Sequence, residues 1–145
     1  MNISVIVPLF NEDESLPELY AWIERVMKAN NFTYEVIFVN DGSTDRSWDV
    51  IRELSEKSEN VRGIKFRRNY GKSPALYCGF NEAKGDVVIT MDADLQYSPD
   101  EIPELYRMIV EDGYDPYLVI SRTASRVTLF QRQSLQNSSM LRHVR

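Results

Sequence analysis

Residues 87–103, VVITMDADLQYSPDEIP, determine how the rest of the sequence is interpreted. A short apolar run rich in β-branched residues predicts a buried strand, and it ends directly in Asp92 and Asp94, followed by Gln96. A proline-flanked acidic segment then begins a helix that we expect over residues 99–111. Carboxylates at the end of a buried strand need a cation, hydrogen-bond donors or open solvent, because burying an unpaired charge is unfavourable.

The same unit of a strand followed by a helix occurs three more times before residue 87. Strands are expected over residues 3–8, 34–39 and 61–66, and helices over residues 16–29, from an N-cap at Ser43 or Thr44 to Glu56, and over residues 69–83. Four strands alternating with four helices predict an α/β fold, with a mostly parallel sheet and helices on both faces. Sheets of this kind bind ligands at the carboxyl ends of their strands.

Polar side chains follow three of the four predicted strands. They are Asn11 and Glu12 after the first strand, Asn40 and Asp41 after the second, and Asp92 and Asp94 after the fourth. Because the carboxyl ends of parallel strands meet at one edge of a sheet, we expect these side chains to share one rim. Asp92 and Asp94 are two residues apart in an extended segment and therefore point the same way. Carboxylate oxygens suit Mg²⁺ or Mn²⁺, which also take substrate phosphates as ligands.

Composition excludes several classes of function. The 145 residues are 43% hydrophobic and 27% charged, as expected for one soluble globular domain. A net charge of −5 argues against a nucleic-acid partner. The single cysteine excludes an internal disulfide and favours a reducing, cytoplasmic compartment, and the single histidine excludes a multi-histidine metal site. No apolar run approaches the roughly 18–20 residues that span a bilayer.

Three phosphate- or metal-binding motifs fail on their spacing. GKS at residues 71–73 does not complete a P-loop, because Phe66 stands where that motif needs its first glycine. DADLQ does not begin a calcium loop, since Tyr97 and Pro103 replace the required glycine and glutamate. No G-x-G-x-x-G follows the first strand. One alternative stays open, an aspartyl phosphotransferase or other phosphate-binding α/β module with Asp92 as the nucleophile.

Five motifs together resemble a known family. They are VIVPLFNEDESLPEL (5–19), VNDGSTD (39–45), RNYGKSPAL (68–76), GFNEAKGD (79–86) and MDADLQYSPDEIPEL (91–105). In this order and spacing they resemble the inverting, nucleotide-sugar-dependent glycosyltransferases with a GT-A fold, over about residues 2–115. The DADLQ segment with its proline-flanked acidic continuation is similar to the branch that makes polyprenyl-phosphate sugars, which includes dolichol-phosphate mannose synthase.

This resemblance implies a role for each matching residue. The residues implied in nucleotide-sugar binding are Pro8, Asn11, Glu12, Asp41, Lys72 and Asp92, with Asp41 on the base. Asp92, Asp94 and Gln96 would form the catalytic centre, where Asp92 and Asp94 hold Mg²⁺ or Mn²⁺ and the donor diphosphate. Asn40 departs from the aspartate often found at its position. The implied acceptor is a polyprenyl phosphate or a glycan, and in-line attack on the sugar carbon inverts its configuration.

The tail departs from the family pattern after Asp115. Residues 1–115 are expected to be an incomplete donor-binding domain, and residues 116–145 an atypical, Ser/Arg/Gln-rich tail with little helical or strand period after Ile120. Codons can be chosen for residues 128–144 that, read one frame over, encode SLSKTIPSKLFNAAAR, which resembles the acceptor-side segment of this branch. A frame-shifted end predicts weak or no turnover, so an inactive nucleotide-binding remnant is a further alternative. Any membrane contact, at the cytoplasmic face, would come through the lipid acceptor or a missing C-terminal region.

Overall fold

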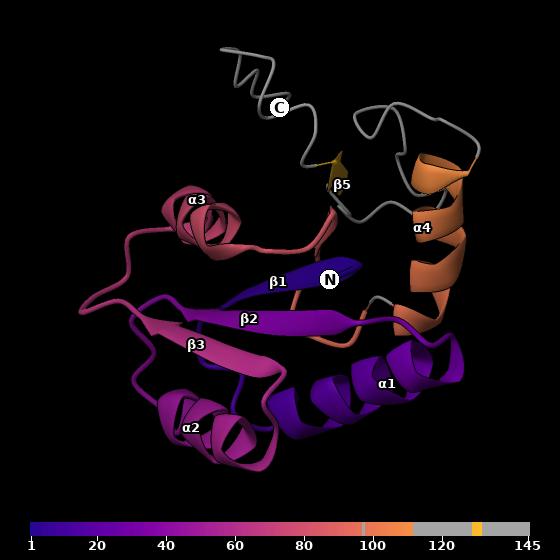
Figure 1. The fold of residues 1–145 in the computed structure, drawn as a ribbon. Coiled ribbons are helices and arrows are strands. Elements are labelled where there is room, and N and C mark those ends of the chain that lie inside the picture. Colours follow the sequence, from indigo (N-terminus) through magenta and orange to yellow (C-terminus); the bar gives the residue numbers. More distant parts are fainter. Residues whose placement is uncertain (97, 112–128, 132–145) are drawn as a thin grey trace.

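One sheet organises the described part of the chain, and this computed structural model describes residues 1–96, 98–111 and 129–131. Its strands are β1 (Ile3–Leu9), β2 (Tyr34–Asn40), β3 (Val61–Lys65), β4 (Val87–Thr90) and β5 (Leu129–Gln131), in the order β3-β2-β1-β4-β5 (Figure 1). The first four strands are parallel, and β5 runs antiparallel to β4. The expected α/β class with a mostly parallel sheet is confirmed.

Helices cover both faces of this sheet, as the alternating pattern predicts. They are α1 (Leu16–Ala29), α2 (Ser47–Lys57), α3 (Lys72–Glu82) and α4 (Ile102–Val110), with the short 3₁₀ helix η1 (Pro99–Glu101) leading into α4. Figure 1 shows α3 on the face opposite to α1 and α2. Among the described residues, no helix combines the length and the apolar character needed to cross a membrane.

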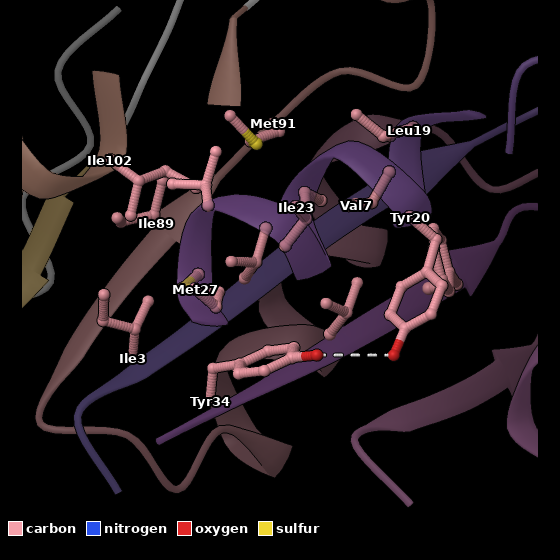
Figure 2. Close-up of a cluster of buried hydrophobic side chains, with 14 of the residues drawn as sticks. Ile3, Val7, Leu19, Tyr20, Ile23, Met27, Tyr34, Ile89, Met91 and Ile102 are labelled. Atoms are coloured by element: carbon pink, nitrogen blue, oxygen red, sulfur yellow. Dashed lines mark hydrogen bonds between the residues drawn. The ribbon is translucent and has the colours of Figure 1, made fainter. Parts of the chain in front are cut away.

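The core has two layers because successive strand residues point to opposite faces. Alternate residues of β1, such as Val5 and Val7, pack with α1, α2 and α4, whereas Ile6 packs with the smaller cluster under α3. Figure 2 shows Ile23 and Met27 of α1 lying over the β1 side chains of the larger layer. Each such aliphatic side chain stabilises the fold by about 1.5–3 kcal/mol when fully buried.

The second and third main helices begin later than the sequence predicts. The expected N-cap at Ser43 or Thr44 is wrong: α2 begins at Ser47, because the Ser43 hydroxyl accepts the Asn11 N–H instead (2.9 Å). The start of α3 shifts from residue 69 to Lys72, where Gly71 with a φ of 102° precedes the helix. Both shifts follow from contacts between loops that are distant in sequence.

The tail contains a strand that the sequence does not predict. Leu129–Gln131 pairs antiparallel with β4, with Ile89 opposite Leu129 and Val87 opposite Gln131. The weak strand period expected after Ile120 gave no indication of these three residues, which form backbone pairs despite the polar composition around them. The rest of the tail from residue 116 lies outside the described residues.

A buried carboxylate links the strands under α3. Glu35 on β2 is 2% exposed, and its Oε1 accepts hydrogen bonds from the Ser4 hydroxyl (2.6 Å) and the Lys84 N–H (2.7 Å). Its Oε2 pairs with Arg62 (2.9 Å), which also reaches the Glu82 carboxylate (2.7 Å). Burial alone would raise the pKa of Glu35, but these donors outweigh burial and lower the pKa below its ordinary value of 4.5.

We predict that Glu35→Gln lowers the free energy of unfolding at neutral pH by about 1.5–3 kcal/mol, since hydrogen bonds to a charged group are lost. Because the folded pKa lies below the unfolded one, this contribution is complete above pH 4.5 and disappears as the pH falls through the folded value. Urea unfolding of the wild type and the variant at pH values from 7 to 3 measures this contribution to the free energy of unfolding. The control Glu82→Gln removes the exposed partner of Arg62 and should cost less than about 1 kcal/mol. Equal losses in the two variants would contradict the role of the buried network.

Candidate active site

The strand order creates a crevice between β1 and β4. The chain runs outward from β1 through β2 to β3, then returns to place β4 on the other side of β1. Ligands of such sheets bind outside the carboxyl ends of the strands where the order reverses. A cavity of about 180 Å³ lies at this point, and its lining residues are Pro8, Leu9, Phe10, Glu12, Asp92, Ala93 and Asp94.

Asp92 and Asp94 occupy different electrostatic environments although both line this cavity. Asp92 forms an ion pair with Lys72, with 2.5 Å between Oδ1 and Nζ, and its side chain is 33% exposed. Asp94 is exposed, and its Oδ1 accepts the Gln96 N–H at 3.2 Å. Leu95, which lies between Asp94 and Gln96, has a φ of 62°, so the chain turns sharply directly after Asp94. Asp92 and Asp94, which the sequence predicts to act together, both line the same cavity.

Ser15 fixes the start of α1 against the acidic segment. Its hydroxyl donates to the carbonyl oxygen of Ala93 at 2.6 Å and lies 3.2 Å from a carboxylate oxygen of Glu12. Ser15 is not among the site residues predicted from the sequence. Ser15 stands directly before α1, at the N-cap position, yet its side chain caps no α1 N–H. The hydroxyl instead joins the loop after β1 to the loop after β4.

Asp41 lies beside the site but not in the cavity lining. Only 6% of it is exposed, and its two carboxylate oxygens accept the N–H groups of Tyr70 (2.7 Å) and Gly71 (3.0 Å). These bonds hold the segment before α3 against the end of β2. That Asp41 contacts a nucleotide base stays a prediction. The structure adds that its carboxylate holds the backbone directly before Lys72, the first residue of α3.

Asn11 ties the loop after β1 to the loop after β2. It has a φ of 54°, a conformation that asparagine tolerates better than most residues, and its Oδ1 accepts the N–H groups of Thr44 (2.8 Å) and Asp45 (3.3 Å). Asn40 is fully buried nearby, and its Oδ1 accepts the Ser43 N–H at 3.0 Å. Within the described residues, the Asn40 Nδ2 has no hydrogen-bond partner.

The structure brings together most of the residues that the sequence singled out. Pro8, Glu12, Asp92 and Asp94 line one cavity, and Lys72 joins them through Asp92. Residues 1–96 and 98–111 contain no group of three or more histidine, cysteine, aspartate or glutamate side chains arranged for a metal. Two carboxylates nevertheless fit Mg²⁺ or Mn²⁺, because these ions commonly take one or two protein carboxylates and complete their shell with water and substrate phosphates.

Comparison with known proteins identifies the family. The model of glycosyl transferase family 2 matches residues 4–144, almost the whole chain. The chain belongs to glycosyltransferase family 2. This membership favours the glycosyltransferase interpretation of the acidic pair over the aspartyl phosphotransferase alternative.

The curated relatives of this family 2 chain include undecaprenyl-phosphate 4-deoxy-4-formamido-L-arabinose transferases. The protein of Proteus mirabilis is 46% identical over 114 residues, covering 78% of this chain and 35% of the relative. That of Photorhabdus laumondii is 43% identical over 125 residues, covering 86% and 38%. That of Pectobacterium carotovorum is 40% identical over 144 residues, covering 97% and 42%. The chain thus spans roughly two fifths or less of the length of these relatives.

Solved structures establish the fold as GT-A. The mannosyltransferase PcManGT from Pyrobaculum calidifontis, in complex with GDP-Man and Mn²⁺, superposes with a TM-score of 0.66 at 25% identity, covering 76% of this chain and 32% of that one. Glucosyl-3-phosphoglycerate synthase from Mycobacterium tuberculosis, in complex with Mn²⁺, UDP and phosphoglyceric acid, gives 0.60 at 24% identity, covering 76% and 39%. The second likeness concerns the fold alone.

We predict that Asn11→Ala lowers the free energy of unfolding by about 0.5–1.5 kcal/mol, since it removes the acceptor of two solvent-exposed loop N–H groups. Asn31→Ala is the matched control, because Asn31 shares the backbone conformation (φ 55°) but stands outside this loop contact. Urea unfolding of both variants separates the lost hydrogen bonds from the backbone strain. An Asn11→Ala loss no larger than that of Asn31→Ala would contradict the bridging role.

Proposed function

We propose that the chain binds a nucleotide-diphospho-sugar in the β1/β4 crevice and supplies the donor side of an enzyme that transfers the sugar to a polyprenyl phosphate. One observation carries the proposal: Asp92 and Asp94 share a cavity with Pro8 and Glu12 at the point where the strand order reverses. Such a crevice is where α/β sheets accept nucleotides. Family membership makes sugar transfer the reaction class that fits this geometry best.

Asp92 and Asp94 would hold a divalent cation, Mg²⁺ or Mn²⁺, together with the donor diphosphate. When bound, this cation supplies charge neutralisation for the diphosphate leaving group. Mn²⁺ accompanies a nucleotide or nucleotide sugar in two of the similar GT-A structures, which supports a divalent cation for this chain. Gln96, next in the acidic segment, would contact the same group.

The remaining predicted residues would orient the donor. In the proposal, Asp41 faces the base, while Asn11 and Glu12 line the nucleoside side of the crevice and Lys72 contacts the diphosphate. The backbone ties of Asn11 and Asp41 would keep the three loops in place before the donor arrives. Pre-formed loops lower the ordering cost of binding, because less conformational freedom is lost.

The proposed acceptor is the phosphate of a polyprenyl lipid, as the names of the curated relatives indicate for those proteins. A phosphate oxygen is already anionic at neutral pH, so its attack needs little general-base assistance. In-line attack on the sugar carbon, opposite the departing diphosphate, inverts its configuration. We assign the acceptor side to the part of the longer relatives that this match does not cover, and the site of action to the cytoplasmic face of a membrane.

We further propose a domain boundary near residue 115, with a donor-binding domain before it and a distinct tail after it. Two origins for the tail compete. A frame shift within the coding sequence is one, and a divergent family tail in the native frame is the other. The family match extends through the tail to residue 144, and this observation favours the native frame.

Sequencing the coding DNA discriminates between these two origins. A frame shift predicts that the codons for residues 128–144, read one frame over, encode a string close to SLSKTIPSKLFNAAAR. Codons that encode an unrelated string in that frame would contradict the shift and leave residues 116–145 as native sequence. The outcome also decides which tail belongs on the protein used for activity measurements.

For the donor site, we predict that calorimetric titration of UDP, GDP and their sugars detects binding that requires Mn²⁺. Asp94→Ala should weaken this binding by more than about tenfold, since one of two protein ligands of the cation is removed. Asp86→Ala is the matched control, because Asp86 is exposed at the opposite end of the same strand and should bind like the wild type. Failure of the wild type to bind any of these nucleotides, with or without Mn²⁺, would contradict a donor site in this chain.

A further inference from the structure

The ion pair between Lys72 and Asp92 occupies an oxygen that the proposed cation needs. Nζ of Lys72 lies 2.5 Å from Oδ1 of Asp92, a short distance for a charge-assisted hydrogen bond. Both side chains stay partly accessible, Lys72 at 45% and Asp92 at 33%. Exposure of this degree makes the pair weak enough to exchange for another cation.

The backbone fixes where Lys72 can reach. Asp41 accepts the N–H groups of Tyr70 and Gly71 directly before it, and Gly71 takes a φ of 102° that favours glycine. Gly42 packs against this segment so closely that a Cβ would lie 2.3 Å from the carbonyl carbon of Arg68. The loop is therefore held against the end of β2, and α3 starts with Lys72 within reach of Asp92.

We propose that Lys72 and the divalent cation compete for Asp92. Lys72 holds the carboxylate while no cation is bound, and it moves from Asp92 to the donor phosphates when the cation and the nucleotide bind together. The inference rests on the proposed donor site and adds an order of exchange within it. An ammonium group and a dication repel each other, so the Asp92 oxygen cannot serve both at full strength.

The competition predicts effects of opposite sign for one substitution. Lys72→Met keeps the length of the side chain and removes its charge. Without its competitor, Asp92 should bind Mn²⁺ alone about two- to fivefold more tightly, the range that corresponds to a partly exposed ion pair. The same variant should bind UDP in the presence of saturating Mn²⁺ about tenfold more weakly, because a charge-assisted contact to phosphate is lost.

Free Mn²⁺ measured by electron paramagnetic resonance gives the first affinity, and calorimetry with UDP gives the second. Lys57→Met serves as the control, because Lys57 is exposed in the last turn of α2 and the substitution changes the net charge equally. Lys72→Gln provides a second removal of the charge, and circular dichroism checks that each variant is folded. The control should match the wild type in both measurements.

The outcomes separate this inference from the proposed function. Tighter Mn²⁺ binding and weaker UDP binding in both Lys72 variants support the competition. Mn²⁺ binding that is unchanged or weaker in folded Lys72 variants, while the wild type binds Mn²⁺, overturns the competition and leaves the donor site standing. Absence of Mn²⁺ binding to the wild type and to both Lys72 variants overturns the competition and the proposed metal site together.

Discussion

The parallel pairing of β1 with β4 is the contact on which the site depends. Ile3 lies opposite Val87 and Ile6 opposite Thr90, although more than 80 residues separate the two strands in sequence. A further backbone bond from the Met91 N–H to the Ile6 carbonyl (2.9 Å) continues the alignment to the strand end. Asp92 therefore emerges beside the end of β1, and a shift by one residue would turn it away from the crevice.

Packing under α3 extends this constraint to the basic partner of Asp92. Gly79 lies so close to Ile6 that a Cβ added at Gly79 would lie 2.5 Å from the Ile6 side chain. Ala75 is fully buried in the same layer. Small residues on this helix let it lie close to the sheet. The short separation brings the first residue of α3, Lys72, within reach of Asp92. Core packing and site geometry are thus set by the same helix.

Local patterns in the sequence were sufficient to predict the four parallel strands, the presence of the four main helices and the position of the acidic pair. β-Branched runs such as residues 34–39 predict buried strands, and Asp92 and Asp94 are placed at the rim simply because they follow one. Glu12 is placed at the same rim by the same reasoning, because it follows β1.

Contacts between distant loops account for what the sequence could not predict. Asp41 accepts hydrogen bonds from two N–H groups before α3, and Ser15 donates to the Ala93 carbonyl. Both contacts depend on which loops meet in the fold, and no local sequence period encodes that. The late start of α2 has the same cause, since Ser43 bonds to Asn11 across the loops. Strand β5 consists of three residues, too short a run to give a strand signal.

We propose that a divalent cation and a nucleotide bind together in the β1/β4 crevice. Two-dimensional ¹H–¹⁵N NMR of the chain with UDP and substoichiometric Mn²⁺ tests it directly, because the paramagnetic ion broadens nearby amide resonances. We expect broadening at Phe10, Glu12, Asp92 and Asp94. The amides of a second groove, which lies between α1 and the η1–α4 segment, should stay sharp; its lining residues are Trp22, Arg25, Val26, Ala29, Asn30, Asp100 and Pro103. Broadening centred on that groove, with the crevice amides unaffected, would contradict it.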